Sequence, residues 1–172
     1  EPIDKGIDAI FEPVVSRAIP FAAVLGNHDD EFSMNRVEIY DHIRQFPGNL
    51  TGTVDGITGV TNFVIPLYQS SSERVMNVIY GLDSNRGVIE PDQVAWYNRV
   101  SQEFTKLNKG NPIPSLAFFH IPLPEFKEAI VDLDARFYGT RKEQVACLDK
   151  NTGLFNAFKR NGDVMAVFVG HD

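Results

Sequence analysis

The sequence has little cysteine, little positive charge and no long hydrophobic run. Its one cysteine, Cys147, excludes a framework of internal disulfides in a chain of 172 residues. Lysine and arginine total 16 against 23 aspartate and glutamate, giving a net charge of −7 and a pI of about 5.1. An acidic chain is a poor partner for a nucleic-acid backbone, so we expect no such partner. No stretch approaches the ~18 apolar residues of a membrane span, so we expect none.

What is present is the composition of a globular domain, with 43% hydrophobic and 23% charged residues. The chain opens at Glu1 without an initiator methionine and closes on Gly170-His171-Asp172, directly after an apolar run. Domains rarely end on a buried strand, so we interpret residues 1–172 as a single domain truncated from a longer protein. Any targeting signal would lie in the missing N-terminus, which leaves the localisation open and compatible with an extracytoplasmic protein.

Hydrophobic periodicity predicts alternating helices and strands. Helices are expected over residues 4–18, 33–46, 91–107, 124–130 and 153–160. Strands are expected over residues 21–25, 61–68, 74–82, 115–119 and 164–169. Ser33 is the expected N-cap of the second helix, and Val37 and Leu107 are expected on buried helix faces. This order predicts an α/β fold with mainly parallel inner strands and a sheet that is mixed toward the edge carrying the central hairpin, with loops over 47–62 and 131–150.

Three predicted strands are followed by polar residues of similar kind. Asn27, His28 and Asp29 follow the first strand, His120 follows residues 115–119, and His171 follows residues 164–169. Because functional groups gather beyond the carboxyl ends of strands in open α/β sheets, we expect these side chains to share one edge. The fourth histidine, His42, lies in a predicted helix beside charged residues, and we interpret it as solvated.

The residue types at this edge suit a metal site. Neutral imidazoles and an amide oxygen are good ligands for a borderline divalent metal, so His120, His171 and Asn27 can hold one ion. His28 can instead donate a proton to a leaving group, with Asp29 or Asp30 fixing its tautomer. The alternative is structural: hydrogen-bonded loop histidines, a tight turn at Asn27 and a solvated acidic loop.

The motifs also resemble a known family. Gly26-Asn27-His28-Asp29 resembles the GNH(D/E) block of calcineurin-like metallophosphoesterases, the strand ending at His120 resembles their single-histidine block, and Gly170-His171-Asp172 resembles the start of their GHxH block. Further stretches are similar to the purple-acid-phosphatase-like branch, namely Leu82-Asp83-Ser84 and residues 91–97, 120–126 and 151–155.

The resemblance implies part of a four-layer α/β/β/α sandwich with mixed sheets around two transition-metal ions (Fe, Zn or Mn). It implies that Asn27, His120 and His171 ligate one metal. It places His28, supported by Asp29, near the leaving-group oxygen of a phosphate-ester substrate. The two ions would activate the hydroxide that attacks phosphorus.

The sequence departs from the family pattern in ways that bear on activity. The upstream DxH and GDxx(D/Y) blocks are absent, Gly162-Asp163 precedes a strand and is expected to be a turn, and the second histidine of GHxH would follow Asp172. About half of the metal site is therefore present. We expect a full-length parent that is a dinuclear phosphoesterase and a fragment that is itself inactive and metal-free or weakly metal-binding. Missing inner strands would also leave a sheet edge through which copies can self-associate.

Two other interpretations remain open. The chain can be a non-catalytic binding or scaffold module that keeps the fold. It can also be a mononuclear metallohydrolase, with Asp83 or Asp172 as the carboxylate ligand. The upstream blocks in the parent gene separate the first of these from an enzyme.

Overall fold

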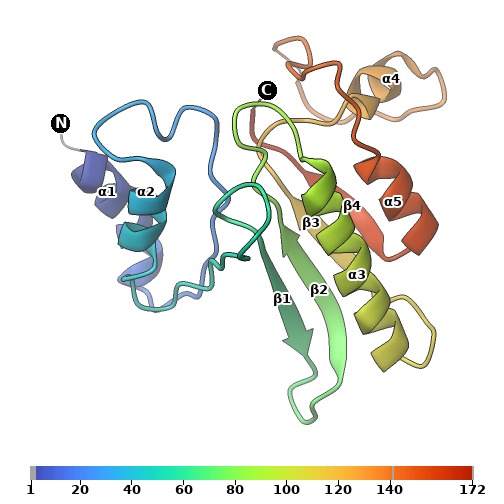
Figure 1. Ribbon diagram of the computed structural model, residues 1–172, viewed down its shortest axis with the longest axis horizontal. Coiled ribbons are helices and arrows are strands. Elements are labelled where there is room, and N and C mark those ends of the chain that lie inside the picture. Colours follow the sequence, from blue (N-terminus) through green and yellow to red (C-terminus); the bar gives the residue numbers. More distant parts are fainter. Residues whose placement is uncertain (1–2, 141, 172) are drawn as a thin grey trace.

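The computed structural model describes residues 3–140 and 142–171, which form two regions lying side by side (Figure 1). The helical region, residues 3–50, holds α1 (Ile3–Val15) and α2 (Arg36–Ile43). The sheet region comprises the described residues from 51 onward. Its elements are β1 (Phe63–Tyr68), β2 (Val75–Gly81), α3 (Pro91–Leu107), β3 (Ser115–Phe118), α4 (Glu125–Val131), α5 (Leu154–Asn161) and β4 (Val164–Phe168).

The sheet is mixed, as predicted. Its four strands lie in the order β1-β2-β3-β4, with β1 antiparallel to β2 and the other two pairings parallel. The helices α3 and α5 cover one face (Figure 1). Tyr97 of α3 and Phe158 of α5 pack edge to face there, with ring centroids 4.9 Å apart, and Tyr97 makes a similar contact with Tyr80 of β2 at 5.1 Å. The main hydrophobic core therefore lies between the helices and the sheet.

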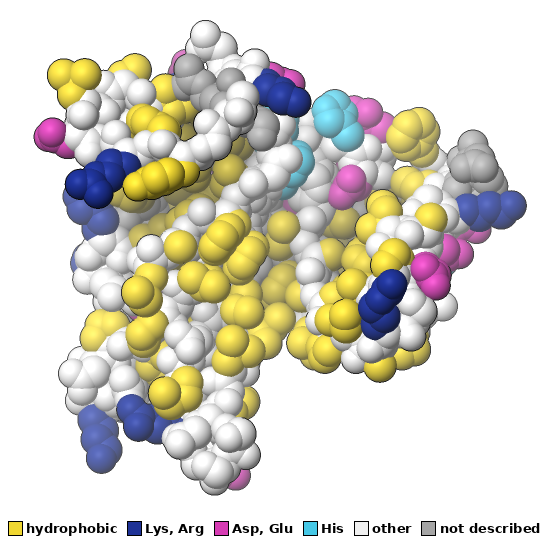
Figure 2. Space-filling model, turned by 180° about the vertical axis from the view of Figure 1, so that it is seen from behind, with side chains coloured by type: hydrophobic (Ala, Val, Ile, Leu, Met, Phe, Trp, Pro, Cys, Tyr) yellow, Lys and Arg dark blue, Asp and Glu magenta, His cyan; other side chains and the backbone are white. Residues whose placement is uncertain are grey.

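No helix of the described residues covers the other face of the sheet (Figure 1). Phe118 and Phe168 stack across β3 and β4 with centroids 4.6 Å apart, and Met165 is 76% exposed. Figure 2, seen from behind, shows hydrophobic side chains gathered over the strands. The described residues thus form one sheet with helices on one face, which is consistent with part of the metallophosphoesterase fold.

The prediction that residues 21–25 form a strand of the sheet is wrong. This segment makes only an isolated parallel bridge, from Phe21 to Asn49. The backbone N–H of Ala23 donates to the Thr51 hydroxyl at 2.9 Å, and that of Leu25 donates to the Thr61 hydroxyl at 3.1 Å. Side-chain oxygens therefore take the place of a ladder partner.

Helix boundaries and faces need smaller corrections. Asn35, not Ser33, caps α2, because its side chain accepts from two backbone N–H groups and Glu38 completes a capping box. Val37 and Leu107 are 55% and 76% exposed, so neither faces the core. No helix in the described part of the chain is long and apolar enough to cross a membrane.

Gly162 and Asp163 form the turn predicted before β4. Gly162 has φ +69° and ends α5, in the left-handed region that glycine favours. Asp163 is buried and accepts hydrogen bonds from the hydroxyls of Tyr80, at 3.2 Å, and Tyr97. The turn therefore ties the start of β4 to β2 and α3.

Candidate functional site

The side chains of Asn27, His120 and His171 lie together at the carboxyl edge of the parallel strands. His120 follows β3, and its Nε2 atom lies 3.0 Å from the Oδ1 atom of Asn27. His171 follows β4, and its ring centroid lies 5.1 Å from that of His120. Histidine side chains are visible at the rim between the two regions in Figure 2. Residues 93 positions apart in the sequence thus meet at one point.

Gly26 and Gly170 allow the two loops to come close to the ring of His120. A Cβ atom on Gly26 would lie 3.2 Å from Nε2 of His120, and one on Gly170 would lie 3.4 Å from Nδ1 of the same ring. The N–H of Gly170 also donates to the backbone oxygen of His120 at 3.2 Å. The backbone before Asn27 and that before His171 therefore both pack closely against the imidazole of His120.

The surroundings of His120 favour its neutral form. Burial lowers the pKa of His120 below its ordinary 6.5, and the neighbouring His171 lowers it further, while the Asp29 carboxylate acts in the opposite direction. A neutral imidazole has a lone pair for a metal. The site thus presents two imidazoles and an amide oxygen, which is a donor set suited to a borderline divalent cation.

His28 lies at the open side of the site, with 71% of its side chain exposed. Its Nδ1 atom lies 2.8 Å from a carboxylate oxygen of Glu31, and a turn from His28 to Glu31 brings the two together. The structure thus pairs His28 with Glu31, whereas Asp29 or Asp30 was expected to fix this ring. Asp29 instead accepts the N–H of Gly26 at 2.7 Å, and Asp30 lies 3.0 Å from Arg86.

Asp83 is a poor candidate for a metal ligand, because its carboxylate is fully buried and already shared. It pairs with Arg36 and accepts backbone N–H groups from Val60, Thr61 and Asn85. Asp172 lies outside the described residues. Among residues 3–140 and 142–171 no three His, Cys, Asp or Glu side chains group as a metal cluster. A mononuclear site with Asp83 as its carboxylate ligand is thus not supported.

His42 lies away from this edge but is not simply solvated. Its Nε2 atom lies 2.7 Å from a carboxylate oxygen of Asp8, and its side chain is 24% exposed. The pair joins α2 to α1. Its role is therefore structural.

Sequence reasoning missed Arg36 and Arg86. Arg36 is the first residue of α2, and its guanidinium reaches both the loop before Asn27 and Asp83. A cation at a helix N-terminus opposes the helix dipole. An arginine at this unfavourable helix position is the sequence signal that could have indicated a special role for Arg36.

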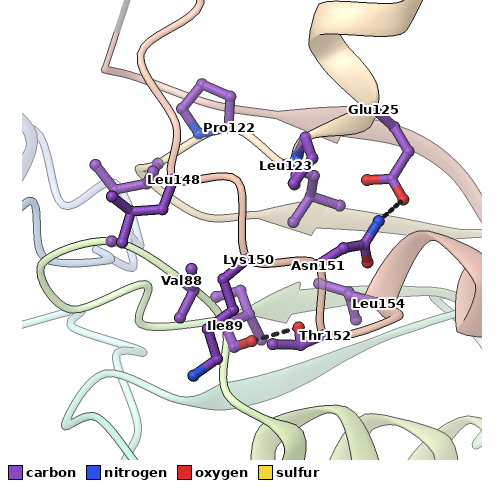
Figure 3. A pocket seen from close by; sticks show the side chains of 13 residues that line it. Val88, Ile89, Pro122, Leu123, Glu125, Leu148, Lys150, Asn151, Thr152 and Leu154 are labelled. Carbon is purple, nitrogen blue, oxygen red and sulfur yellow. Dashed lines mark hydrogen bonds between the residues drawn. The ribbon is translucent and has the colours of Figure 1, made fainter.

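A small space lies between the loop after His120 and residues 148–154, and the side chains that line it nearly fill it (Figure 3). Asn151 donates to Glu125 at 2.6 Å, and the Thr152 hydroxyl donates to the backbone oxygen of Ile89 at 2.6 Å. Leu148 and Leu154 also line this space, whose volume is only about 10 Å³. It has room for about one water molecule and therefore offers no space for a larger ligand.

Comparison with known proteins assigns the amino-acid sequence to a family. The Calcineurin-like phosphoesterase family profile matches residues 2–172. The chain belongs to the calcineurin-like phosphoesterases. The resemblance carried by the blocks at Asn27, His120 and His171 is confirmed at this level.

Three curated relatives of this calcineurin-like phosphoesterase illustrate the range of the family. It is 32% identical to "Probable inactive purple acid phosphatase 29" and 29% identical to "Probable inactive purple acid phosphatase 14", both of Arabidopsis thaliana, over 98% and 99% of the chain. It is 33% identical to "Phosphatase DCR2" of Saccharomyces cerevisiae over 66% of the chain and 22% of that protein. The chain spans about half the length of the two plant relatives, 49% of each. No solved structure matches it.

Proposed function

We propose that the protein hydrolyses phosphate esters with bound metal ions, one of them held by Asn27, His120 and His171. The observation that carries this proposal is the meeting of Asn27 with His120 at 3.0 Å, with His171 beside them, at the carboxyl edge of the sheet. Membership of the calcineurin-like phosphoesterases supports a phosphoester substrate at the level of the family.

The donor atoms fit a transition metal such as Zn, Mn or Fe. Two neutral imidazoles and an amide oxygen carry no net charge, and burial lowers the pKa of His120, which favours its neutral form. When bound, the metal would supply positive charge against the negative charge that develops on the phosphate oxygens. Since these three ligands are neutral, we assign the carboxylate that would balance the charge, and the ligands of a second ion, to residues outside those described.

His28 is the residue of this chain that we assign to proton transfer. Its Nδ1 atom is engaged by Glu31, so Nε2 is the nitrogen available to donate a proton to a leaving alkoxide. Asp29 closes the turn through the N–H of Gly26 and holds His28 next to Asn27. The exposure of the ring leaves space for an ester in front of it.

A second candidate function is a binding or scaffold module that keeps this fold without turnover. One observation favours it: curated relatives carry the word "inactive" in their names. The two candidates differ in one measurable property, because only the enzyme turns over an ester in the full-length protein.

The test compares two site variants and one control variant of the full-length protein on two esters, with bound metal measured alongside. His28→Ala should lower turnover of an alkyl phosphate by roughly 10²–10⁴-fold, because a poor leaving group needs an acid, and lower that of nitrophenyl phosphate much less. Asn27→Ala should lose metal and activity on both esters, while His42→Ala should change neither.

Three outcomes would count against these assignments. Equal losses on both esters with loss of metal in His28→Ala would make His28 a ligand. Metal binding that survives Asn27→Ala would remove the carrying observation. Metal-loaded wild-type protein without turnover of either ester would favour the scaffold module.

A further inference from the structure

Arg36 reaches from the start of α2 into the seam between the two regions. Its side chain is 11% exposed, its Nη1 atom donates to the backbone oxygen of Gly26 at 2.8 Å, and its Nη2 atom pairs with Asp83. The residues of this pair stand 47 positions apart. One guanidinium therefore joins a helical-region loop to the end of β2.

Asp83 provides a rigid anchor for that guanidinium. Its Oδ2 atom accepts the N–H groups of Val60 at 2.8 Å and Thr61 at 3.2 Å, and its Oδ1 atom accepts the N–H of Asn85 at 2.8 Å. A Cβ on Gly59 would lie 2.7 Å from the Cβ of Asp83, so the loop packs closely on this carboxylate. Buried acceptors that are satisfied on several sides hold one geometry.

The bond from Arg36 acts on the peptide unit that enters Asn27. The carbonyl of Gly26 shares a planar peptide group with the nitrogen of Asn27, so fixing that oxygen fixes the plane from which Asn27 departs. Asp29 holds the N–H of Gly26 on the other side at 2.7 Å. With both polar groups of Gly26 held and its Cα against the ring of His120, the Asn27 side chain is aimed at Nε2.

We propose that the Arg36–Asp83 pair is the positioning device of the site, which orients Asn27 toward His120 through the carbonyl of Gly26. Arg36 is a positioning residue in this scheme, because its bonds to the Gly26 carbonyl and Asp83 act on the candidate ligand Asn27 through the backbone. The expected effect on metal binding rests on the proposed function, whereas the contacts among Arg36, Gly26 and Asn27 do not depend on it. The planar guanidinium of arginine is needed, because one group has to donate hydrogen bonds to the Gly26 carbonyl and to the Asp83 carboxylate at the same time.

The experiment compares Arg36→Met and Arg36→Lys in the full-length protein, with Asp163→Asn as the control. Asp163 is an equally buried carboxylate with hydrogen-bonding partners at the other end of the sheet. Zn²⁺ affinity is measured by competition titration, the thermal midpoint by calorimetry, and the Asn27–His120 distance by metal-free crystal structures. The Zn²⁺ ion followed is the one lost in Asn27→Ala.

Arg36→Met should weaken Zn²⁺ binding by roughly 10–100-fold, the usual effect of losing a partner that orients a ligand. Arg36→Lys keeps the charge but places its donors on one nitrogen, without the planar fork, so it should fold and still bind Zn²⁺ more weakly than wild type. In both metal-free structures the Asn27 side chain should leave His120. Asp163→Asn should lower the thermal midpoint without changing Zn²⁺ affinity.

Other outcomes would overturn the inference. If the Arg36 variants lose stability like Asp163→Asn while Zn²⁺ affinity stays at the wild-type value, Arg36 only stabilises the fold. If Arg36→Met does not fold, the same comparison is made with Arg36→Lys. If the wild-type protein binds no metal, the proposed function fails, and the metal-free structures still test the positioning role. A contact of 3.0 Å between Asn27 Oδ1 and His120 Nε2 that persists in the metal-free Arg36→Lys structure would overturn that role.

Discussion

The two regions satisfy their buried groups in different ways. In the sheet region, Tyr80, Tyr97 and Phe158 pack in contact, and the one buried carboxylate near them, Asp163, accepts two tyrosine hydroxyls. In the helical region a smaller apolar cluster forms around Ile7, Leu25, Ile39 and Ile43. An apolar cleft of about 750 Å³ opens beside that cluster, between α1, α2 and residues 23–25. One region is closely packed and the other is partly open.

The candidate site lies on the seam between these regions. Asn27 and His28 come from the helical region, whereas His120 and His171 come from the sheet region. Several hydrogen bonds and ion pairs cross the seam, such as the bond from the Leu25 N–H to the Thr61 hydroxyl and the pair of Arg36 with Asp83. The integrity of the site therefore depends on these crossing bonds as well as on either hydrophobic core.

The largest expected effect tests the difference in packing. Phe158→Ala should lower the free energy of unfolding by about 3–5 kcal/mol, because Phe158 is 4% exposed in a closed core. Phe11→Ala should cost about 1–2 kcal/mol, because Phe11 is only half-buried and lines the open cleft. Urea denaturation of both variants measures the difference.

Phe32 provides the control for the comparison of Phe158→Ala with Phe11→Ala. Phe32→Ala, at a side chain that is 80% exposed, should stay within about 0.5 kcal/mol of wild type. Equal losses for Phe158→Ala and Phe11→Ala would show that the cleft is not an open, weakly packed space.

A smaller effect concerns the buried tyrosines at alkaline pH. Burial, and next the Asp163 carboxylate, raise the pKa values of Tyr80 and Tyr97 well above the ordinary 10. The unfolded chain releases these protons near pH 10 while the folded protein retains them. Their contribution to stability is therefore complete below about pH 10 and falls as the pH rises beyond it.

Tyr97→Phe checks this reasoning. It should cost about 1–3 kcal/mol at neutral pH, because the buried Asp163 carboxylate loses a donor, and should reduce the alkaline loss of stability. Tyr138→Phe, at a ring that is 90% exposed, should alter neither. A Tyr97→Phe variant with the same alkaline slope as wild type would assign that slope to other groups. Both are followed by thermal denaturation between neutral pH and about pH 11.

Most of the sheet region follows from local signals in the sequence. The runs that became β3 and β4 are short and apolar, and Pro91 begins α3 at the position where proline is favoured. Because parallel strands end at one edge, the meeting of Asn27, His120 and His171 could be expected from the sequence alone. Residue 27 meets the others even though residues 21–25 are not a strand of the sheet.

What could not be predicted depends on contacts distant in sequence or on loop detail. A run such as residues 21–25 specifies extended backbone, but not that Thr51 and Thr61 hydroxyls would accept its N–H groups. The partner of His28 depends on one turn, which selects Glu31 among three neighbouring acidic residues. The role of Asp83 required knowing that Arg36 reaches it across the seam.

The smallest expected effect concerns the N-cap of α2, from whose first turn Arg36 crosses the seam. Asn35→Ala should lower the free energy of unfolding by about 1 kcal/mol, because the Asn35 side chain accepts the N–H groups of Val37 and Glu38, each at 3.0 Å. Ser33→Ala should change it by less than about 0.5 kcal/mol, since Ser33 lies outside the capping box. Chemical denaturation of the two variants compares the costs, and a larger loss for Ser33→Ala would place the cap where the sequence alone suggested it. Because fraying of this turn also loosens Arg36, Asn35→Ala should weaken Zn²⁺ binding slightly in the full-length protein, which Ser33→Ala should not do.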